Sequence, residues 1–183
     1  MPRIAPLPAP YPAEIQGHFD QVMPPGVPPL VLFTTLASSE RAWKKFRAGS
    51  LLDGRLISLR EREIVIDRVC ARAGCEYEWG VHISAFAAAA RLTREDIAAT
   101  LAPPGATGPW TGNEAVLVAT VDALHDRSTL TDAEFADLQR HYSNDQILEI
   151  LLLCGFYRTV AYLSNGLALP LETTAARFAQ YAA

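Results

Sequence analysis

Four side chains capable of proton transfer or thiol chemistry lie between residues 63 and 82: Glu63, Cys75, Glu78 and His82. Cys75, Glu78 and His82 stand at relative positions 0, 3 and 7, so a helical period of 3.6 places them on one stripe. Glu78 and His82 are one turn apart, close enough to hydrogen-bond or share a proton. Glu63 precedes Cys75 by twelve residues and can face the same cleft from a neighbouring helix. The pattern predicts one cleft holding carboxylate, imidazole and thiol groups.

The individual residues also admit structural interpretations. Cys75 lies near the expected start of its helix, where the helix dipole favours a thiolate, but a small buried residue is the alternative. Cys70 and Cys154 stand in apolar helical patterns and are interpreted as core thiols. Glu63 and Asp67 lie on a helix rich in charged residues, so exposure to solvent is the alternative for both. The apolar residues next to Asp67 are expected to bury the opposite face of this helix, which favours solvent exposure as the alternative for Asp67.

Other chemistries lack their usual motifs. Glu78-x3-His82 offers two metal ligands on one helix, but no H-E-x-x-H or paired Cys-x-x-Cys completes a zinc set. No G-x-S-x-G sequence marks a hydrolase serine, and no glycine-rich loop marks a phosphate site. We therefore expect neither a metal nor a cofactor.

Helices are expected to position these residues. The segment 58–73 is predicted to be one helix, because Ser58 and Glu61 occupy capping-box positions, and Gly74 is expected to break the chain before the next helix. Similar cap pairs precede later helical patterns: Thr93 and Asp96, Thr111 and Glu114, Thr131 and Glu134, Ser143 and Gln146. The last pair begins the most apolar helix, expected to end at Gly166 and to be buried against the central ones. No alternating strand pattern occurs, so the predicted fold class is all-α.

The chain divides into an arm and one domain. Residues 1–29 hold nine of the thirteen prolines and are expected to form an extended arm with a short helical piece at 13–23. Residues 30–183 are interpreted as a single helical domain, a size that can bury a substantial core. At its start, residues 30–52 read as two helical segments with Ser38 or Ser39 as a cap, closed by Asp53-Gly54.

Composition limits the classes of partner and location. A net charge of −4 gives no electrostatic basis for binding nucleic acid. No apolar run is interpreted as transmembrane, and prolines interrupt the region where a signal peptide would lie, so no membrane partner is expected. Three cysteines do not make a disulfide framework, which favours a reducing cytoplasm.

The spacing Glu63-x11-Cys75-x2-Glu78-x3-His82 resembles the signature of the carboxymuconolactone decarboxylase family, which includes the alkyl hydroperoxidase D proteins. The phrase GCEYEW, followed by His82, is similar to a common form of that family's core helix. The resemblance covers roughly residues 30–172. It implies an all-α, alkyl hydroperoxidase D-like bundle built around a central helical hairpin, with these four residues as the catalytic set and no cofactor. It also implies a homo-oligomer, either a dimer, a trimer or a hexamer.

One position departs from the hydroperoxidase branch, whose motif is Glu-x11-Cys-x2-Cys-x3-His. Here Glu78 replaces the second thiol, and a carboxylate cannot resolve a sulfenic acid. Cys70 is expected on another helix, and Cys154 could meet Cys75 only through tertiary packing. The first hypothesis is therefore a cofactor-free acid/base lyase or isomerase acting on a small organic acid or lactone. A thiol-dependent hydroperoxide reductase using Cys75 is the second, and a non-catalytic helical oligomer is the third.

Overall fold

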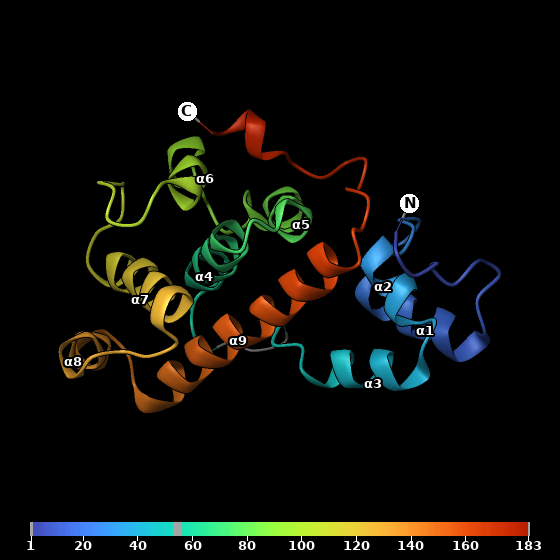
Figure 1. Cartoon of the computed structure of the whole chain (residues 1–183), viewed down its shortest axis with the longest axis horizontal. Helices are drawn as coiled ribbons and strands as arrows, with labels where there is room; N and C mark the ends of the chain where they lie inside the picture. Colours follow the sequence, from blue (N-terminus) through green and yellow to red (C-terminus); the bar gives the residue numbers. More distant parts are fainter. Residues whose placement is uncertain (1, 53–55, 183) are drawn as a thin grey trace.

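All regular structure in the described part of the chain, residues 2–52 and 56–182 of a computed structural model, is helical. The predicted all-α class is therefore confirmed (Figure 1). The α-helices are α1 (Ala13–Val22), α2 (Val31–Leu36), α3 (Glu40–Ala48), α4 (Leu59–Arg72), α5 (Glu76–Phe86), α6 (Arg94–Leu101), α7 (Asn113–Arg127), α8 (Asp132–His141) and α9 (Asn144–Gly166), followed by a short 3-10 helix at Phe178–Gln180.

Most helices begin where the sequence places a cap. Four have complete capping boxes, with N-caps at Ser58, Thr93, Thr131 and Ser143. In each box the hydroxyl accepts a backbone N–H of the first turn, while the carboxylate or amide three residues later accepts the N–H of the cap. Ser39 caps α3. The predicted turn at Asp53-Gly54 lies outside the described residues.

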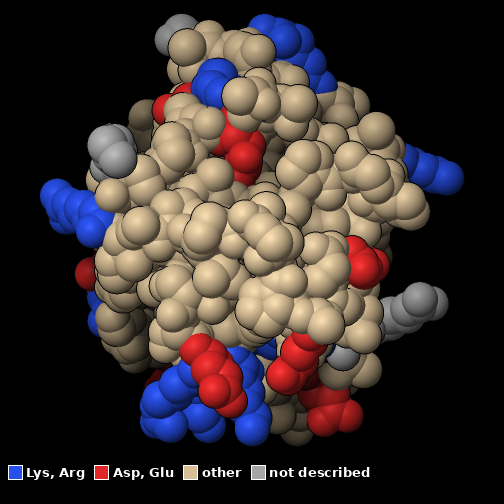
Figure 2. All heavy atoms as spheres, turned by 90° about the vertical axis from the view of Figure 1, so that its right-hand side faces the viewer, with Lys and Arg blue, Asp and Glu red and all other residues tan. Residues whose placement is uncertain are grey.

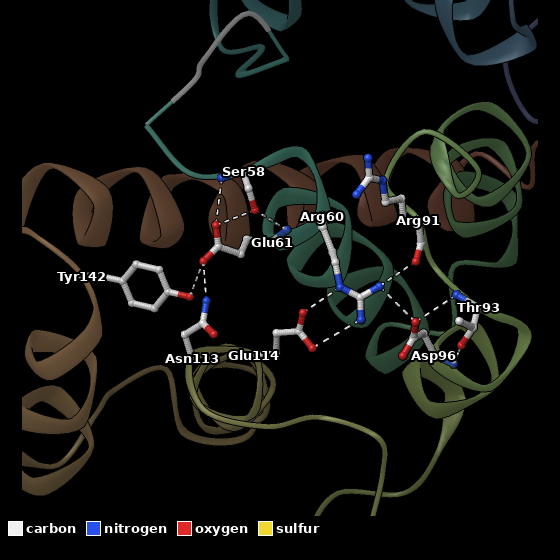
Figure 3. A network of polar contacts seen from close by, with 9 residues as sticks. All are labelled: Ser58, Arg60, Glu61, Arg91, Thr93, Asp96, Asn113, Glu114 and Tyr142. Atoms are coloured by element: carbon white, nitrogen blue, oxygen red, sulfur yellow. Dashed lines mark hydrogen bonds and ion pairs between the residues drawn. The ribbon is translucent and has the colours of Figure 1, made fainter.

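The start of α7 corrects one prediction. Its N-cap is Gly112, which adopts a positive φ of 53°, and no side chain caps the helix, so Thr111 and Glu114 do not form the expected box. The Glu114 carboxylate instead accepts from Arg60 Nε of α4 at 2.6 Å (Figure 3). Arg60 also donates to Asp96 of α6 at 3.0 Å. Glu114 therefore forms a tertiary ion pair with Arg60 instead of a local cap at the start of α7.

The α4–α5 hairpin occupies the centre of the molecule (Figure 1). Helix α4 packs against α5, α6, α7 and α9, and its apolar residues Ile64, Val65 and Ile66 are fully buried. Helix α9 also packs against α5. By length and composition α9 could cross a membrane, but half of its apolar stretch is buried within the protein. Its apolar sequence is accounted for by this position beneath the hairpin.

The arm packs on the rest of the chain. The N–H of Arg3 donates to the Leu167 carbonyl at 2.8 Å, and the N–H of Leu7 donates to Thr34 at 2.9 Å. The helical piece expected at 13–23 is present as α1. Its residue Phe19 is buried, with its ring centroid 5.4 Å from that of Trp43 in α3. The face of the molecule on this side has a broad central area without acidic or basic side chains (Figure 2).

Candidate active site

The turn between α4 and α5 sets the two helices that carry the site. Gly74 has a positive φ of 60°, which a glycine adopts without steric strain. Its N–H donates to the Ala71 carbonyl at 3.0 Å, and the Cys75 N–H donates to the Cys70 carbonyl at 2.8 Å. This bond pair is a Schellman motif, so the chain reverses immediately after α4. Two polar stripes result on the hairpin: Glu63, Asp67 and Cys70 on α4, and Cys75, Glu78 and His82 on α5.

His82 is held between two carboxylates. Its Nδ1 lies 2.7 Å from Glu63 Oε2 on α4, and its Nε2 lies 3.5 Å from Glu78 Oε1 one turn earlier on α5. All three side chains are buried. The prediction that Glu63 faces the His82 stripe from the neighbouring helix is confirmed by this contact.

The carboxylates keep His82 protonated. Burial alone would lower the pKa of the imidazole, but hydrogen bonds to Glu63 and Glu78 outweigh it and raise that pKa to about 10. Glu63 has a second partner, Arg62, whose Nη2 lies 2.8 Å from Glu63 Oε1. The site is therefore a row in which basic and acidic side chains alternate, Arg62, Glu63, His82 and Glu78, and in which His82 can act as an acid and Glu78 as a base.

A cavity of about 510 Å³ opens beside this row. Glu78 and Arg62 line it, and one oxygen of the buried Glu78 carboxylate, Oε2, has no hydrogen-bond partner. Helix α1 supplies part of the wall through Gln21 and Val22. Six aromatic side chains also line the cavity: Phe33, Trp43, Phe46, Phe86, Phe156 and Tyr157. The acid/base pair therefore borders a space able to hold a small, partly apolar molecule.

Cys75 takes a different position from the other predicted site residues. It is the N-cap of α5 and is fully buried, and its N–H donates to the Cys70 carbonyl. It is not among the residues that line the cavity. The structure thus brings Glu63, Glu78 and His82 together, while Cys75 lies at the closed end of the hairpin.

Asp67 corrects the interpretation that it faces solvent. Its side chain is fully buried on α4, and neither carboxylate oxygen has a hydrogen-bond partner. Burial raises the pKa of Asp67 well above its usual range, and the negative charge of Glu63 adds to this while His82 opposes it. A signal was present in the sequence, because Glu63, Asp67 and Cys70 have the helical spacing 0, 4 and 7. Asp67 is a third carboxyl group beside this row, and its burial favours the protonated form.

The aromatic residues next to the motif belong to the core. Trp79 is fully buried and donates from Nε1 to Thr100 Oγ1 at 2.9 Å. Tyr77 is buried and donates its hydroxyl to Glu172 at 2.5 Å. Across the described residues, no group of three or more His, Cys, Asp or Glu side chains is arranged to hold a metal ion.

The region that carries the site matches a known family. Residues 38–122 match the Carboxymuconolactone decarboxylase family. All four residues of the predicted catalytic set, Glu63, Cys75, Glu78 and His82, lie inside that match. None of the curated proteins is similar to this sequence.

The whole fold is also similar to solved structures. An uncharacterized peroxidase-related protein from Silicibacter sp. TM1040 has a TM-score of 0.81 and 18% identity, covering 97% of this chain and 96% of its own. The alkylhydroperoxidase AhpD core from Ralstonia eutropha JMP134 has a TM-score of 0.79 and 18% identity, covering 94% of this chain and 93% of its own. At this identity the similarity shows the fold. The hairpin region, residues 38–122, therefore matches the carboxymuconolactone decarboxylase family, and the chain as a whole has the alkyl hydroperoxidase D-like fold.

Proposed function

We propose that the protein is a cofactor-free acid/base enzyme, a lyase or isomerase that acts on a small organic acid or lactone. The observation that carries this proposal is the position of His82 between two carboxylates, one facing each ring nitrogen, of which Glu78 lines a cavity. A proton donor and a proton acceptor side by side at the wall of a binding space are the minimum that such a reaction requires.

Each residue of the row has a role in this mechanism. Glu63 accepts the Nδ1–H of His82 and fixes the ring, leaving Nε2 toward Glu78. Glu78 borders the cavity and exchanges a proton between a substrate carbon and His82. Arg62, paired with Glu63, places positive charge at the cavity wall, where it stabilises an anion that develops on the substrate.

The cavity supports a substrate of modest size with an acidic group. Its volume of about 510 Å³ is in the range of small-molecule sites. Arg47 and Arg62 both line it, and guanidinium groups favour carboxylates through paired hydrogen bonds. The aromatic walls suit the carbon skeleton of the same molecule. We also place this chemistry in the cytoplasm, on the basis of the three free cysteines.

Substitution of the charged row tests the proposal. In a screen of small carboxylic acids and lactones, followed by NMR, we expect His82→Ala and Glu78→Gln each to lower kcat/KM about 10²-fold or more. The double variant should lose little beyond either single one, because the two residues work as a unit. Cys75→Ser should retain most of the activity, since the mechanism assigns the thiol no step.

A thiol-dependent hydroperoxide reductase is the second candidate. It is supported by Cys75, whose pKa is lowered by the hydrogen bond from the Cys70 thiol against the opposing effect of burial, and by the peroxidase-related names of the similar structures. The same variants separate the two candidates. Rapid hydroperoxide turnover with a thiol reductant that is abolished by Cys75→Ser, and kept by Glu78→Gln, would replace the acid/base proposal with this one.

A further inference from the structure

A second cavity, of about 370 Å³, lies between α7 and α9 and is separate from the cavity that Glu78 borders. Both helices pack against α4 but not closely against each other, so a groove remains between them. Four apolar side chains line this groove: Val69 of α4, Val121 and Leu124 of α7, and Leu151 of α9. Its size is in the range of small-molecule sites, and no step of the proposed reaction uses it.

The guanidinium group of Arg158 is fixed at the wall of this cavity. Its Nη1 donates to His125 Nδ1 on α7 at 2.6 Å, and its Nε donates to the Tyr162 hydroxyl, one turn later on α9, at 3.0 Å. A guanidinium group has five N–H donors, so these two bonds hold it in place and leave three donors for a ligand. The cavity therefore has a preorganised cation at its edge.

The positive charge of Arg158 is not neutralised by the protein. Among the described residues, no carboxylate forms an ion pair with it. The acidic residues of this part of α7, Asp122 and Asp126, are bound by arginines of α4 instead. Arg68 pairs with Asp122 at 2.8 Å, and Arg72 pairs with both carboxylates. Three guanidinium groups thus face two carboxylates, and one positive charge remains beside the cavity.

His125 is a neutral donor at the same wall. Because a guanidinium group cannot accept a hydrogen bond, His125 Nδ1 is the acceptor and the ring carries its proton on Nε2. Burial lowers the pKa of this imidazole, and the positive charges of Arg158 and Arg72 lower it further. Ser128, the C-cap of α7, also lines the cavity and contributes a hydroxyl group. The polar side of the cavity therefore consists of hydrogen-bond donors around one cation.

We propose that this cavity is a second binding site, which takes a small monocarboxylate with an apolar chain. The carboxylate binds the free N–H groups of Arg158, with His125 and Ser128 as neutral donors, and the chain lies on the apolar side chains of α4, α7 and α9. A planar guanidinium group binds a carboxylate through paired hydrogen bonds. One uncompensated positive charge matches a monoanion, whereas a dianion leaves a negative charge unpaired in an apolar groove.

Sodium hexanoate is the probe, and the imidazole C–H signals of the four histidines are the readout in two-dimensional NMR. The titration is made at fixed pH and ionic strength, and His125→Gln assigns the signal of His125. We expect this signal to shift until it saturates, while the signals of His18 and His141 stay in place. The uncharged 1-hexanol should bind about tenfold or more weakly, because it lacks the charge that Arg158 recognises. A shift confined to His82 places hexanoate only in the other cavity and overturns the proposal.

Two variants with a matched control complete the test. Arg158→Gln should weaken hexanoate binding about tenfold or more. Gly155→Leu should abolish it by filling the cavity, and should fold, because Gly155 lines the cavity and a Cβ there meets no atom within 4 Å. Gly17→Leu, at a helical glycine of α1 with the same free space but outside both cavities, should bind as the wild type does.

Circular dichroism verifies that each variant is folded. The absence of a saturable His125 shift in the wild-type protein overturns the proposal, and so does equal hexanoate binding by the wild type, Arg158→Gln and Gly155→Leu. The outcome does not depend on which reaction the His82 site catalyses, because the two cavities share no lining residue.

Discussion

His82 binds a proton more tightly in the folded chain than a free imidazole does, and this affects stability. With a pKa raised from 6.5 to about 10, the folded state retains a proton that the unfolded state releases. The stabilisation is complete below about pH 6.5 and is lost as the pH rises toward 10. Chemical denaturation should show the free energy of unfolding falling by up to about 1.4 kcal/mol per pH unit across this window.

Two variants isolate the contribution of this histidine. His82→Gln should remove most of the slope between pH 7 and 10, whereas His141→Gln, at an exposed position on α8, should leave the slope unchanged. Equal slopes in the wild-type protein and His82→Gln would show that the imidazole is neutral between the two carboxylates.

The buried Asp67 carboxyl, unlike His82, lowers the free energy of unfolding at neutral pH. Its folded pKa is raised by burial, so above about pH 4 the unfolded state gains from ionising while the folded state does not. Asp67→Asn should therefore raise the free energy of unfolding at pH 7, because asparagine keeps the shape of the side chain and has no charge to gain in the unfolded state. The gain should shrink as the pH approaches 4.

The exposed Asp137→Asn is the matched control for Asp67, and it should change stability by less than about 0.5 kcal/mol. If Asp67→Asn instead destabilises the protein at pH 7, the carboxylate is charged in the folded state and has an ionic partner.

At the scale of the elements, Arg60 holds three helices together. From α4 it binds Glu114 of α7 and Asp96 of α6, and the Asp96 side chain is only 6% exposed. Arg60→Ala leaves a buried carboxylate without its charged partner and should lower the free energy of unfolding by about 1–3 kcal/mol. Arg127→Ala removes the exposed pair with Glu134 and should cost less than about 1 kcal/mol. Similar losses for the two variants would contradict this difference in burial.

The same elements show what a sequence can and cannot predict. Helix starts at Ser58, Thr93, Thr131 and Ser143 were predictable, because a capping box is closed within four residues. Thr111 failed because the partner of Glu114 lies 54 residues away in the chain. The pairing of Glu63 with His82 followed from spacing once a hairpin was assumed.

The approach of Cys75 to Cys70 is not predictable from helical spacing, which places the two on separate helices. It depends on the Schellman reversal at Gly74, where the sequence predicts only a break. Asp67 was misplaced because its apolar neighbours suggested that its own side of α4 faces water. That side is covered by the α5 and α9 helices, a fact of tertiary packing.

At the scale of the whole molecule, we expect the chain to assemble with copies of itself through α9. Leu148, Leu152 and Tyr162 are 59%, 59% and 63% exposed, and their spacing puts them on one side of the helix. A two-fold contact would bring this apolar stripe against its own copy and remove it from water. Light scattering at micromolar concentration should report an oligomer.

Leu148→Glu combined with Leu152→Glu should dissociate that oligomer without loss of helical circular dichroism. Leu56→Glu, at a leucine outside α9 that is 52% exposed, should leave it intact. A wild-type monomer, or a double variant that remains assembled, would exclude α9 as the contact.

Because α1 forms part of the cavity wall, the residues that decide which molecules fit and the residues that transfer protons come from different parts of the chain. The proton-transfer groups belong to residues 63–82, whereas Gln21 and Val22 come from the arm, which joins the body through contacts of its own. Changes in the arm can therefore alter which molecules fit without disturbing the groups that act on them. Relatives that share the hairpin but differ in their leading residues would then diverge in selectivity while keeping one chemistry, and a new preference could evolve by exchanging a terminal segment.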